Sequence, residues 1–481
     1  MNGIRQNKTA RSVIWSAAER FSVQAVQFLL NILLARLIAP EEFGLIAMIN
    51  VFMLIAQSFV DSGFSNALIQ KKDRTEVDFC TVFYFNLTMS IVIYGLFYIC
   101  SSFIANFYEE PRLVNLCRVL GLSLIIQGLS VVPIAKLTSQ LDFKTQAKSS
   151  ITSIIVCGLV GLYFAYWGYG AWALVIQFVG NCTLNTILLC LFSRWQPRFI
   201  FSFKSLSSLF SFGSKLLVAG LLQTIYMNLY SLVIAKKYSA LNVGYYNQSN
   251  IMARFPSVSL MAIITRAIYP IQCSVQDRDE ELLTSYYKYI GMSCFIVFPI
   301  MFCLCVLSEP IIAVVLTEKW MDMAVVFSII CLANMWNAPI SQNNQILNVR
   351  GRSDLFLQAE IIKKIVGVLI LVTTLPFGLL VVCAGIVLYN IFDMTLMTFY
   401  AHKVLKFNYS KYLAILTKYA LLAVIPGVLV FGAISFIPIQ FVKLIIGLVL
   451  YWGAYMSLCL YFRMDEMKYA EETFKSFVSK V

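Results

Sequence analysis

Long apolar stretches recur along almost the whole chain, and they constrain its fold more than any other feature. Most are about 20 to 25 residues long, and a helix of that length, rising 1.5 Å per residue, crosses roughly 30 Å of hydrocarbon. Hydrophobic residues make up 60% of the 481 residues and charged residues only 13%, whereas soluble proteins average about 45–50% and about 25%. The sequence therefore predicts an all-α polytopic membrane protein and excludes a water-soluble domain.

Polar breaks divide these stretches into fourteen predicted transmembrane helices with short connections. The predicted spans cover residues 12–38, 43–67, 79–105, 113–136, 149–168, 170–193, 208–235, 243–266, 288–308, 323–348, 356–376, 378–402, 413–435 and 440–462. Residues 1–11 are basic but lack the apolar core and cleavage site of a signal peptide, so we expect a retained cytoplasmic tail.

Lysine and arginine residues alternate in density from one connection to the next. With the N-terminus inside, 24 of them fall in cytoplasmic loops and tails and five fall in outer loops. Basic residues collect on the cytoplasmic side of membrane proteins. We therefore expect both termini in the cytoplasm and an even number of spans.

Two short patterns recur at offsets of 200 and 206 residues, which indicates an internal repeat. They are Ala35, Arg36 and Gly44, which return as Ala235, Lys236 and Gly244, and Pro133-Ile134, which returns as Pro339-Ile340. The offset equals six spans, so the sequence predicts two parallel six-helix bundles, residues 1–203 and 204–407. Residues 408–481 then hold an appended helix pair and a cytoplasmic tail.

Residues that carry common enzyme chemistry are sparse or lack the required spacing. The chain has one histidine, His402, and no glycine-rich phosphate loop, and its thirteen cysteines show no metal-ligand spacing. We therefore expect no catalytic residue, no metal, no cofactor and no enzyme activity. The net charge of +13 follows from the cytoplasmic loops, so it does not predict nucleic-acid binding.

Three segments carry a resemblance to a known family. They are residues 37–44 (LIAPEEFG), 140–144 (QLDFK) and 349–355 (VRGRSDL). Together with the twelve-plus-two layout, they resemble the polysaccharide transporter family of the multidrug/oligosaccharidyl-lipid/polysaccharide exporter superfamily. The resemblance covers essentially the whole chain, although each motif is short.

The resemblance implies a Wzx-type flippase. Such a protein moves undecaprenyl-diphosphate-linked oligosaccharide across the inner membrane by alternating access, for O-antigen, capsule or exopolysaccharide assembly. It also implies membrane lipids, a polysaccharide polymerase and glycosyltransferases as partners, and we expect a monomer.

Basic residues outnumber acidic ones inside the predicted spans, which favours an anionic substrate. Arginine binds phosphate oxygens with two parallel hydrogen bonds and stays charged. Arg254 is the leading substrate-binding candidate, because it lies near mid-depth and Pro256 follows it. A structural ion pair inside the bundle is the alternative.

Other residues are weaker candidates for substrate binding, each with a structural alternative. Lys215 can instead extend to the headgroups, Arg20 can pair within the bundle, and Arg118 can lie at the interface. Gln342 and Asn343 follow Pro339 and are candidates for a polar cavity wall, although such amides also join helices by hydrogen bonds.

Three carboxylates are candidates for ion coupling, because burial lets an acid take up a proton reversibly. Asp393 lies deepest, about nine residues from the inner end of its span. Asp61 can instead end a helix at the Asp61-Ser62-Gly63 break, and Glu19 adjoins Arg20. Lys363 and Lys364 follow Glu360 at helical spacing, so we expect local pairing there.

Two other functions remain open. A cation-coupled multidrug exporter of the same superfamily predicts an acidic cavity, which the basic excess disfavours. A membrane glycosyltransferase or polymerase predicts an acidic active-site pair or a large outer loop, and neither is evident in the sequence.

Overall fold

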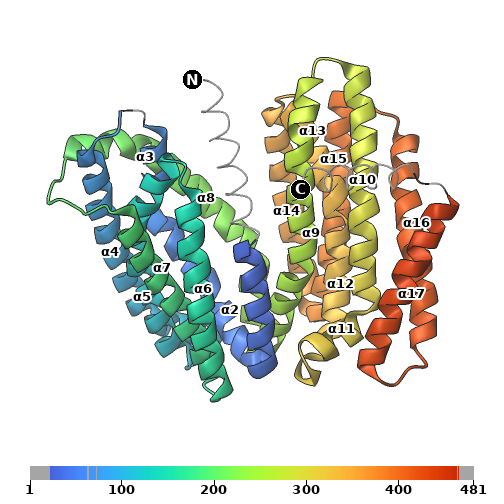
Figure 1. Ribbon diagram of the computed structural model, residues 1–481, viewed down its shortest axis with the longest axis horizontal. Helices are drawn as coiled ribbons and strands as arrows, with labels where there is room; N and C mark the ends of the chain where they lie inside the picture. The colour runs from blue at the N-terminus through green and yellow to red at the C-terminus, as the bar shows by residue number, and fades with distance from the viewer. Residues whose placement is uncertain (1–21, 62–63, 72, 463, 465–481) are drawn as a thin grey trace. The chain divides into compact units, whose positions relative to one another are not determined.

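Helices joined by short connections form the part of the chain that the computed structural model describes, residues 22–61, 64–71, 73–462 and 464. No β-strand occurs among these residues, and eleven helices are long and apolar enough to cross a membrane. This confirms the prediction of an all-α, multi-pass membrane protein (Figure 1).

Each of the fourteen predicted spans overlaps a helix. Three of the predicted spans, 12–38, 208–235 and 356–376, fall on helices that are not among the eleven candidates, namely Ser22–Leu37, α8 (Phe203–Lys237) and α14 (Ser353–Thr374). The predicted span 323–348 consists of two helices that meet at Trp336. The count of fourteen crossings stays a prediction.

Packing divides the chain into two compact units, residues 1–244 and 245–481. The division lies further along the chain than the predicted boundary at 203/204, because α8 packs against α2, α3 and α4. The first unit contains Ser22–Leu37, α2 (Pro40–Asp61), α3 (Phe64–Gln70), α4 (Glu76–Tyr108), α5 (Leu113–Ser139), α6 (Phe143–Tyr166), α7 (Ala171–Ser193), α8 and the first residues of α9 (Ala240–Ser274).

The second unit holds the rest of α9 and all later elements. These are α10 (Asp279–Val306), α11 (Ser308–Val315), the short 3-10 turn Glu318–Trp320, α12 (Met323–Met335), α13 (Asn337–Val349), α14, a second 3-10 turn Leu375–Phe377, α15 (Leu379–Leu405), α16 (Tyr409–Ile434) and α17 (Gln440–Tyr461). Helix α15 packs against α12, α13 and α14. The predicted appended pair, α16 and α17, packs on α10 and α11.

Side chains that cap the helix ends explain several boundaries. Asp142 accepts from the backbone N–H of Thr145 at 3.1 Å at the start of α6, and Asn408 accepts from Ser410 at 2.8 Å at the start of α16. A cap satisfies a backbone N–H that has no partner inside the helix. The polar residues between spans therefore begin the next helix as well as interrupt the apolar pattern.

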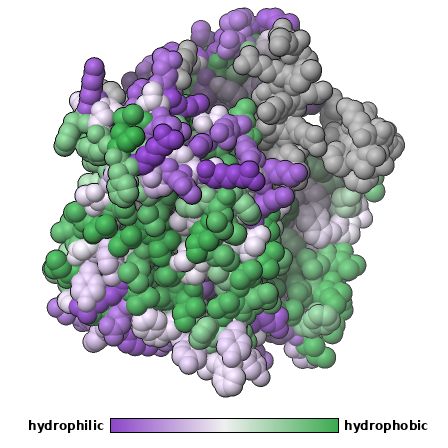
Figure 2. Space-filling model, turned by 60° about the vertical axis from the view of Figure 1, so that its left-hand side comes forward, coloured by the Kyte–Doolittle hydropathy of each residue, from purple (hydrophilic) through white to green (hydrophobic). Residues whose placement is uncertain are grey.

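Large apolar side chains cover the outer faces of these helices. Ile99 and Phe103 on α4 and Phe431 on α16 are each more than 60% exposed. Figure 2 shows a broad hydrophobic surface between hydrophilic edges on the face that it presents. Exposed apolar surface on this scale fits contact with lipid rather than water.

Two glycines at matching places in the internal repeat lie against each other's helix. A Cβ atom on Gly44 would lie 1.8 Å from the carbonyl oxygen of Ala240, and one on Gly244 would lie 2.1 Å from that of Pro40. The beginnings of α2 and α9 therefore approach too closely for any side chain at either position.

Candidate functional site

A polar groove of about 500 Å³ lies between α9 and α13, inside the second unit. Its volume is in the range of small-ligand sites, about 300–1,000 Å³. The groove is lined by Val258, Met261, Ala262, Thr265, Arg266 and Tyr269 from α9, and by Asn337, Ser341, Asn344, Gln345 and Asn348 from α13.

The spacing of the α13 residues explains why they share one wall. Asn337, Ser341, Asn344 and Asn348 are separated by four, three and four residues. Positions three and four apart lie on the same face of an α-helix. Pro339 falls in the first turn of α13, where the missing N–H breaks no helical hydrogen bond.

Hydrogen bonds hold α9 and α13 together at two levels. Near the start of α13, Asn337 Nδ2 donates to Ser257 Oγ at 3.2 Å, and Ser257 Oγ donates to the carbonyl oxygen of Asn334, at the end of α12, at 3.0 Å. Further along, Gln345 Nε2 donates to Gln272 Oε1 at 2.6 Å. The groove wall is therefore fixed at both ends by polar contacts between the two helices.

Three polar side chains of the α13 wall lack hydrogen-bond partners among the described residues. Ser341, Asn344 and Asn348 donate and accept no side-chain hydrogen bond with the residues that the structure describes. Asn344 Oδ1 and Gln345 Oε1 are buried acceptors to which no described residue donates. Because leaving a buried polar group unpaired costs about 1–3 kcal/mol, these groups indicate a place for a polar ligand.

Two arginines of α9 are available to an anion. Arg266 lines the groove, and Arg254 lies one helical turn before the lining residue Val258. Both side chains are exposed, and neither forms an ion pair or hydrogen bond with a described residue. The alternative of an ion pair for Arg254 is therefore not seen among the described residues.

The sequence placed Arg266 in an inner connection, because the predicted span ended at that residue. In the structure, α9 continues to Ser274, so Arg266 lies within the helix.

Gln342 and Asn343, the amides chosen from the sequence, face away from this groove. Gln342 Nε2 donates to Ser293 Oγ at 2.9 Å. Asn343 accepts from Tyr286 Oη at 2.5 Å and donates to Thr398 Oγ1 at 2.9 Å and to Tyr412 Oη at 3.2 Å. These are the helix-joining contacts that the sequence left open as the alternative to a cavity wall.

Asp393 lies in a cluster of three charges between α14 and α15, of which Lys363 and Asp393 are buried and Glu360 is partly exposed. Lys363 Nζ lies 2.5 Å from Glu360 Oε1 and 3.3 Å from Asp393 Oδ1. Lys363 is 5% exposed and Asp393 is 8% exposed. The expected local pairing of Glu360 with Lys363 is present, and Asp393 joins it from the neighbouring helix.

The remaining candidates lie elsewhere or outside the described residues. Arg118 lies between α4 and α5 in the first unit, where its Nε donates to Ser101 Oγ at 3.2 Å and its guanidinium lies 4.3 Å from the centre of the Tyr98 ring. Arg20 and Glu19 lie outside the described residues, as do the side chains of Lys215 on α8 and Asp61 at the end of α2.

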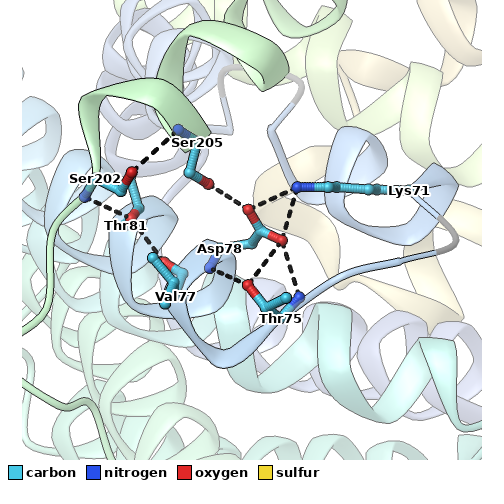
Figure 3. A network of polar contacts seen from close by, with 7 residues as sticks. All are labelled: Lys71, Thr75, Val77, Asp78, Thr81, Ser202 and Ser205. Carbon is cyan, nitrogen blue, oxygen red and sulfur yellow. Dashed lines mark hydrogen bonds and ion pairs between the residues drawn. The ribbon is translucent and has the colours of Figure 1, made fainter.

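A second polar cluster, which the sequence did not predict, surrounds Asp78 in the first unit (Figure 3). Lys71 Nζ donates to both carboxylate oxygens of Asp78 at 2.8 Å, and Ser205 Oγ on α8 also donates to it. The backbone N–H of Thr75 donates to Asp78 Oδ2 at 2.9 Å. We call these four residues the Asp78 network. It ties the start of α4 to the start of α8, and every hydrogen bond of the carboxylate stays within the protein.

A third cluster lies on the connection between α4 and α5. Arg112 contacts Glu41 at 2.6 Å, Glu110 at 2.8 Å and Glu42 at 3.2 Å. The hydrogen bond from Arg112 holds the pKa of Glu110 below its usual range. This cluster joins the connection to the start of α2.

Comparison with known proteins assigns the family. The family model described as "Polysaccharide biosynthesis protein" matches residues 33–325. The chain belongs to this family. The match confirms the resemblance found in the sequence and includes both α9 and the start of the second unit.

Relatives and a solved structure agree with membership of the polysaccharide biosynthesis protein family. The chain is 25% identical to the lipopolysaccharide biosynthesis protein WzxC of Escherichia coli (strain K12), over 74% of this chain and 73% of that one. It is 24% identical to the teichuronic acid biosynthesis protein TuaB of Bacillus subtilis (strain 168), over 87% of each. The structure of the lipid II flippase MurJ in an inward closed conformation has the same fold, with a TM-score of 0.76 at 15% identity, covering 94% of this chain and 99% of that one.

Proposed function

We propose that this protein is a flippase that moves undecaprenyl-diphosphate-linked oligosaccharide across the cytoplasmic membrane for polysaccharide assembly. Its family, the names of its relatives and the fold that it shares with a lipid II flippase support the substrate class. The observation that carries the proposal is the pair of arginines on α9 that have no partner among the described residues, one of them lining a polar groove inside a multi-pass membrane protein.

The arginines supply what a lipid diphosphate needs inside the membrane. A diphosphate is costly to move through a medium of low dielectric constant unless its charge is compensated. Guanidinium groups compensate it with charge and with paired hydrogen bonds. Arg254 and Arg266 are separated by twelve residues, about 18 Å along α9, so they offer an anion two successive contacts at different depths.

Alternating access is the transport mechanism that we propose, with the two units as the moving parts. In this proposal both termini are cytoplasmic, the protein lies in the inner membrane and it works as a monomer. Glycosyltransferases supply its substrate and a polymerase uses its product.

Asp393 is the proposed coupling group. Protonation of Asp393 would remove its charge and weaken its contact with Lys363, leaving Lys363 with Glu360. Such a change in a buried charge cluster can shift the balance between two conformations. Replacing Asp393 by Asn should therefore remove the dependence of transport on the transmembrane proton gradient.

The alternative of a cation-coupled drug exporter predicts carboxylates in the binding groove. None of the groove-lining residues is acidic and one is an arginine. The groove therefore favours an anionic or neutral polar substrate over an organic cation.

Complementation tests the proposed function. In a strain that lacks the gene, Arg254→Ala should abolish surface polysaccharide while the variant protein remains at its normal abundance in the membrane. Arg198→Ala is the matched control, because it removes an exposed arginine outside the groove. Normal surface polysaccharide with Arg254→Ala would remove this residue from the mechanism.

A further inference from the structure

The α13 wall of the groove has a chemistry different from that of the α9 arginines. The side chains of Ser341, Asn344 and Asn348 are neutral, and each can both donate and accept hydrogen bonds. They occupy about 11 Å along the helix, at 1.5 Å per residue. We call these three residues the amide ladder.

The two sides of α13 differ in their hydrogen bonds among the described residues: the side chains of Ser341, Asn344 and Asn348 form none. On the other side, Gln342 and Asn343 bond to α10, α15 and α16. On that side Gln342 Oε1 lacks a partner among the described residues, but Gln342 and Asn343 each form at least one side-chain hydrogen bond, whereas the ladder residues form none. Buried amide oxygens at Asn344 and Gln345 are open to a donor there.

The chemistry of these groups selects among the parts of a lipid-linked glycan. A phosphate that has lost its protons only accepts hydrogen bonds, so it cannot satisfy the buried amide oxygens of Asn344 and Gln345. An acyl or prenyl chain has no donor and would leave the same oxygens unpaired. Sugar hydroxyls both donate and accept, and they match amides and hydroxyls in both directions.

We infer that the amide ladder binds the hydroxyl groups of the sugars nearest the diphosphate, while the arginines of α9 bind the diphosphate itself. This inference rests on the proposed function and adds a separate glycan-binding subsite to it. The groove volume of about 500 Å³ has room for a short segment of glycan. Tyr269, on the opposite wall, presents an aromatic ring against which a sugar can pack.

Binding of two lipids to the purified full-length protein separates the subsites. The probes are undecaprenyl diphosphate, which has no sugar, and the lipid-linked oligosaccharide extracted from the host strain. Asn344→Leu should weaken binding of the glycan-bearing lipid about tenfold and leave binding of undecaprenyl diphosphate unchanged. Arg266→Ala should weaken both.

Two further variants serve as a replacement for Asn344→Leu and as a control. Asn348→Leu changes an exposed ladder residue, so it should fold normally and repeat the effect of Asn344→Leu if the latter proves unstable. Gln358→Leu is the matched control, because it replaces an exposed amide on α14, outside the groove.

The outcomes distinguish the inference from the proposed function. If the wild-type protein binds neither lipid, the proposed function fails. If it binds both lipids but the ladder variants weaken both equally or neither, the proposed function survives and the glycan subsite is overturned. Loss of binding for the glycan-bearing lipid alone supports the subsite.

Discussion

The Asp78 network and the amide ladder are both polar clusters on membrane helices, but their hydrogen bonds differ. Asp78 is 2% exposed and is bonded to Lys71, Thr75 and Ser205. The ladder residues have no such partners among the described residues. A polar group that is satisfied within the protein stabilises the fold, whereas one that is left open beside a groove is available to a ligand. The two clusters should therefore respond differently to substitution.

The largest effect is expected at the buried charges of α14 and α15, which test whether internally paired groups govern stability. Lys363→Met leaves Asp393 and Glu360 without the ammonium group that lies between them. Removing one partner of a buried pair costs about 3–5 kcal/mol. The melting temperature of the detergent-solubilised protein should fall sharply. Adding Asp393→Asn should restore part of it, and a double variant as unstable as the single one would contradict this account.

The Asp78 network should show the next largest effect. Asp78→Ala removes the Asp78 half of the capping box that begins α4, the ion pair with Lys71 and the contact with α8, so we expect a loss of about 3 kcal/mol in stability. Thermal unfolding and membrane abundance measure it. Asp73→Ala, at an exposed neighbour, should change neither. An unaltered melting temperature for Asp78→Ala would mean that the network has no structural role.

The two faces of α13 allow hydrogen-bonded and unbonded polar side chains to be compared within one helix. Asn343→Leu leaves the hydroxyls of Tyr286 and Tyr412 without their amide partner and should cost about 2 kcal/mol. Asn344→Leu should stay within about 0.5 kcal/mol of the wild type but reduce transport. Melting temperature and surface polysaccharide, measured on both variants, check this. If Asn343→Leu and Asn344→Leu lose stability equally, the proposed difference between the two faces of α13 is wrong.

The smallest effect is expected at the Arg112 cluster, which is exposed to water. Glu110→Gln should lower stability by less than about 1 kcal/mol at neutral pH. The pKa of Glu110 is lower in the folded protein than in the unfolded chain, where it is about 4.3. The ionised carboxylate therefore stabilises the fold above the unfolded pKa, and this stabilisation disappears as the pH falls through the folded pKa. Melting curves of the variant and the wild type should therefore converge under acid conditions. A difference that grows with acidification would contradict the sign of this shift.

The positions of the helices could be predicted because membrane crossing depends on local hydropathy. One predicted span covers both α12 and α13, and the structure places the boundary between them at Trp336, three residues before Pro339. Contacts between distant helices, such as those of α8 with α2, α3 and α4, leave no trace in a hydropathy pattern, and the division into two six-helix bundles stays a prediction.

The site was predictable in part. Arg254 was chosen from its depth, and the structure leaves it without a partner among the described residues. The run of amides after Pro339 was recognised, but Gln342 and Asn343 were chosen rather than the residues of the groove. The helical spacing of Asn337, Ser341, Asn344 and Asn348 was the available signal. The sequence alone does not show which side of a helix faces a groove.

Glycan movement across a reconstituted bilayer tests the central claim most directly. Vesicles that contain the purified protein and a fluorescent, diphosphate-linked oligosaccharide lipid should transfer the label to the opposite leaflet. Vesicles with Arg254→Ala should not, although that variant should reconstitute equally well. Absence of transfer by the wild-type protein, together with export of an organic cation, would contradict the proposed function and favour the drug exporter.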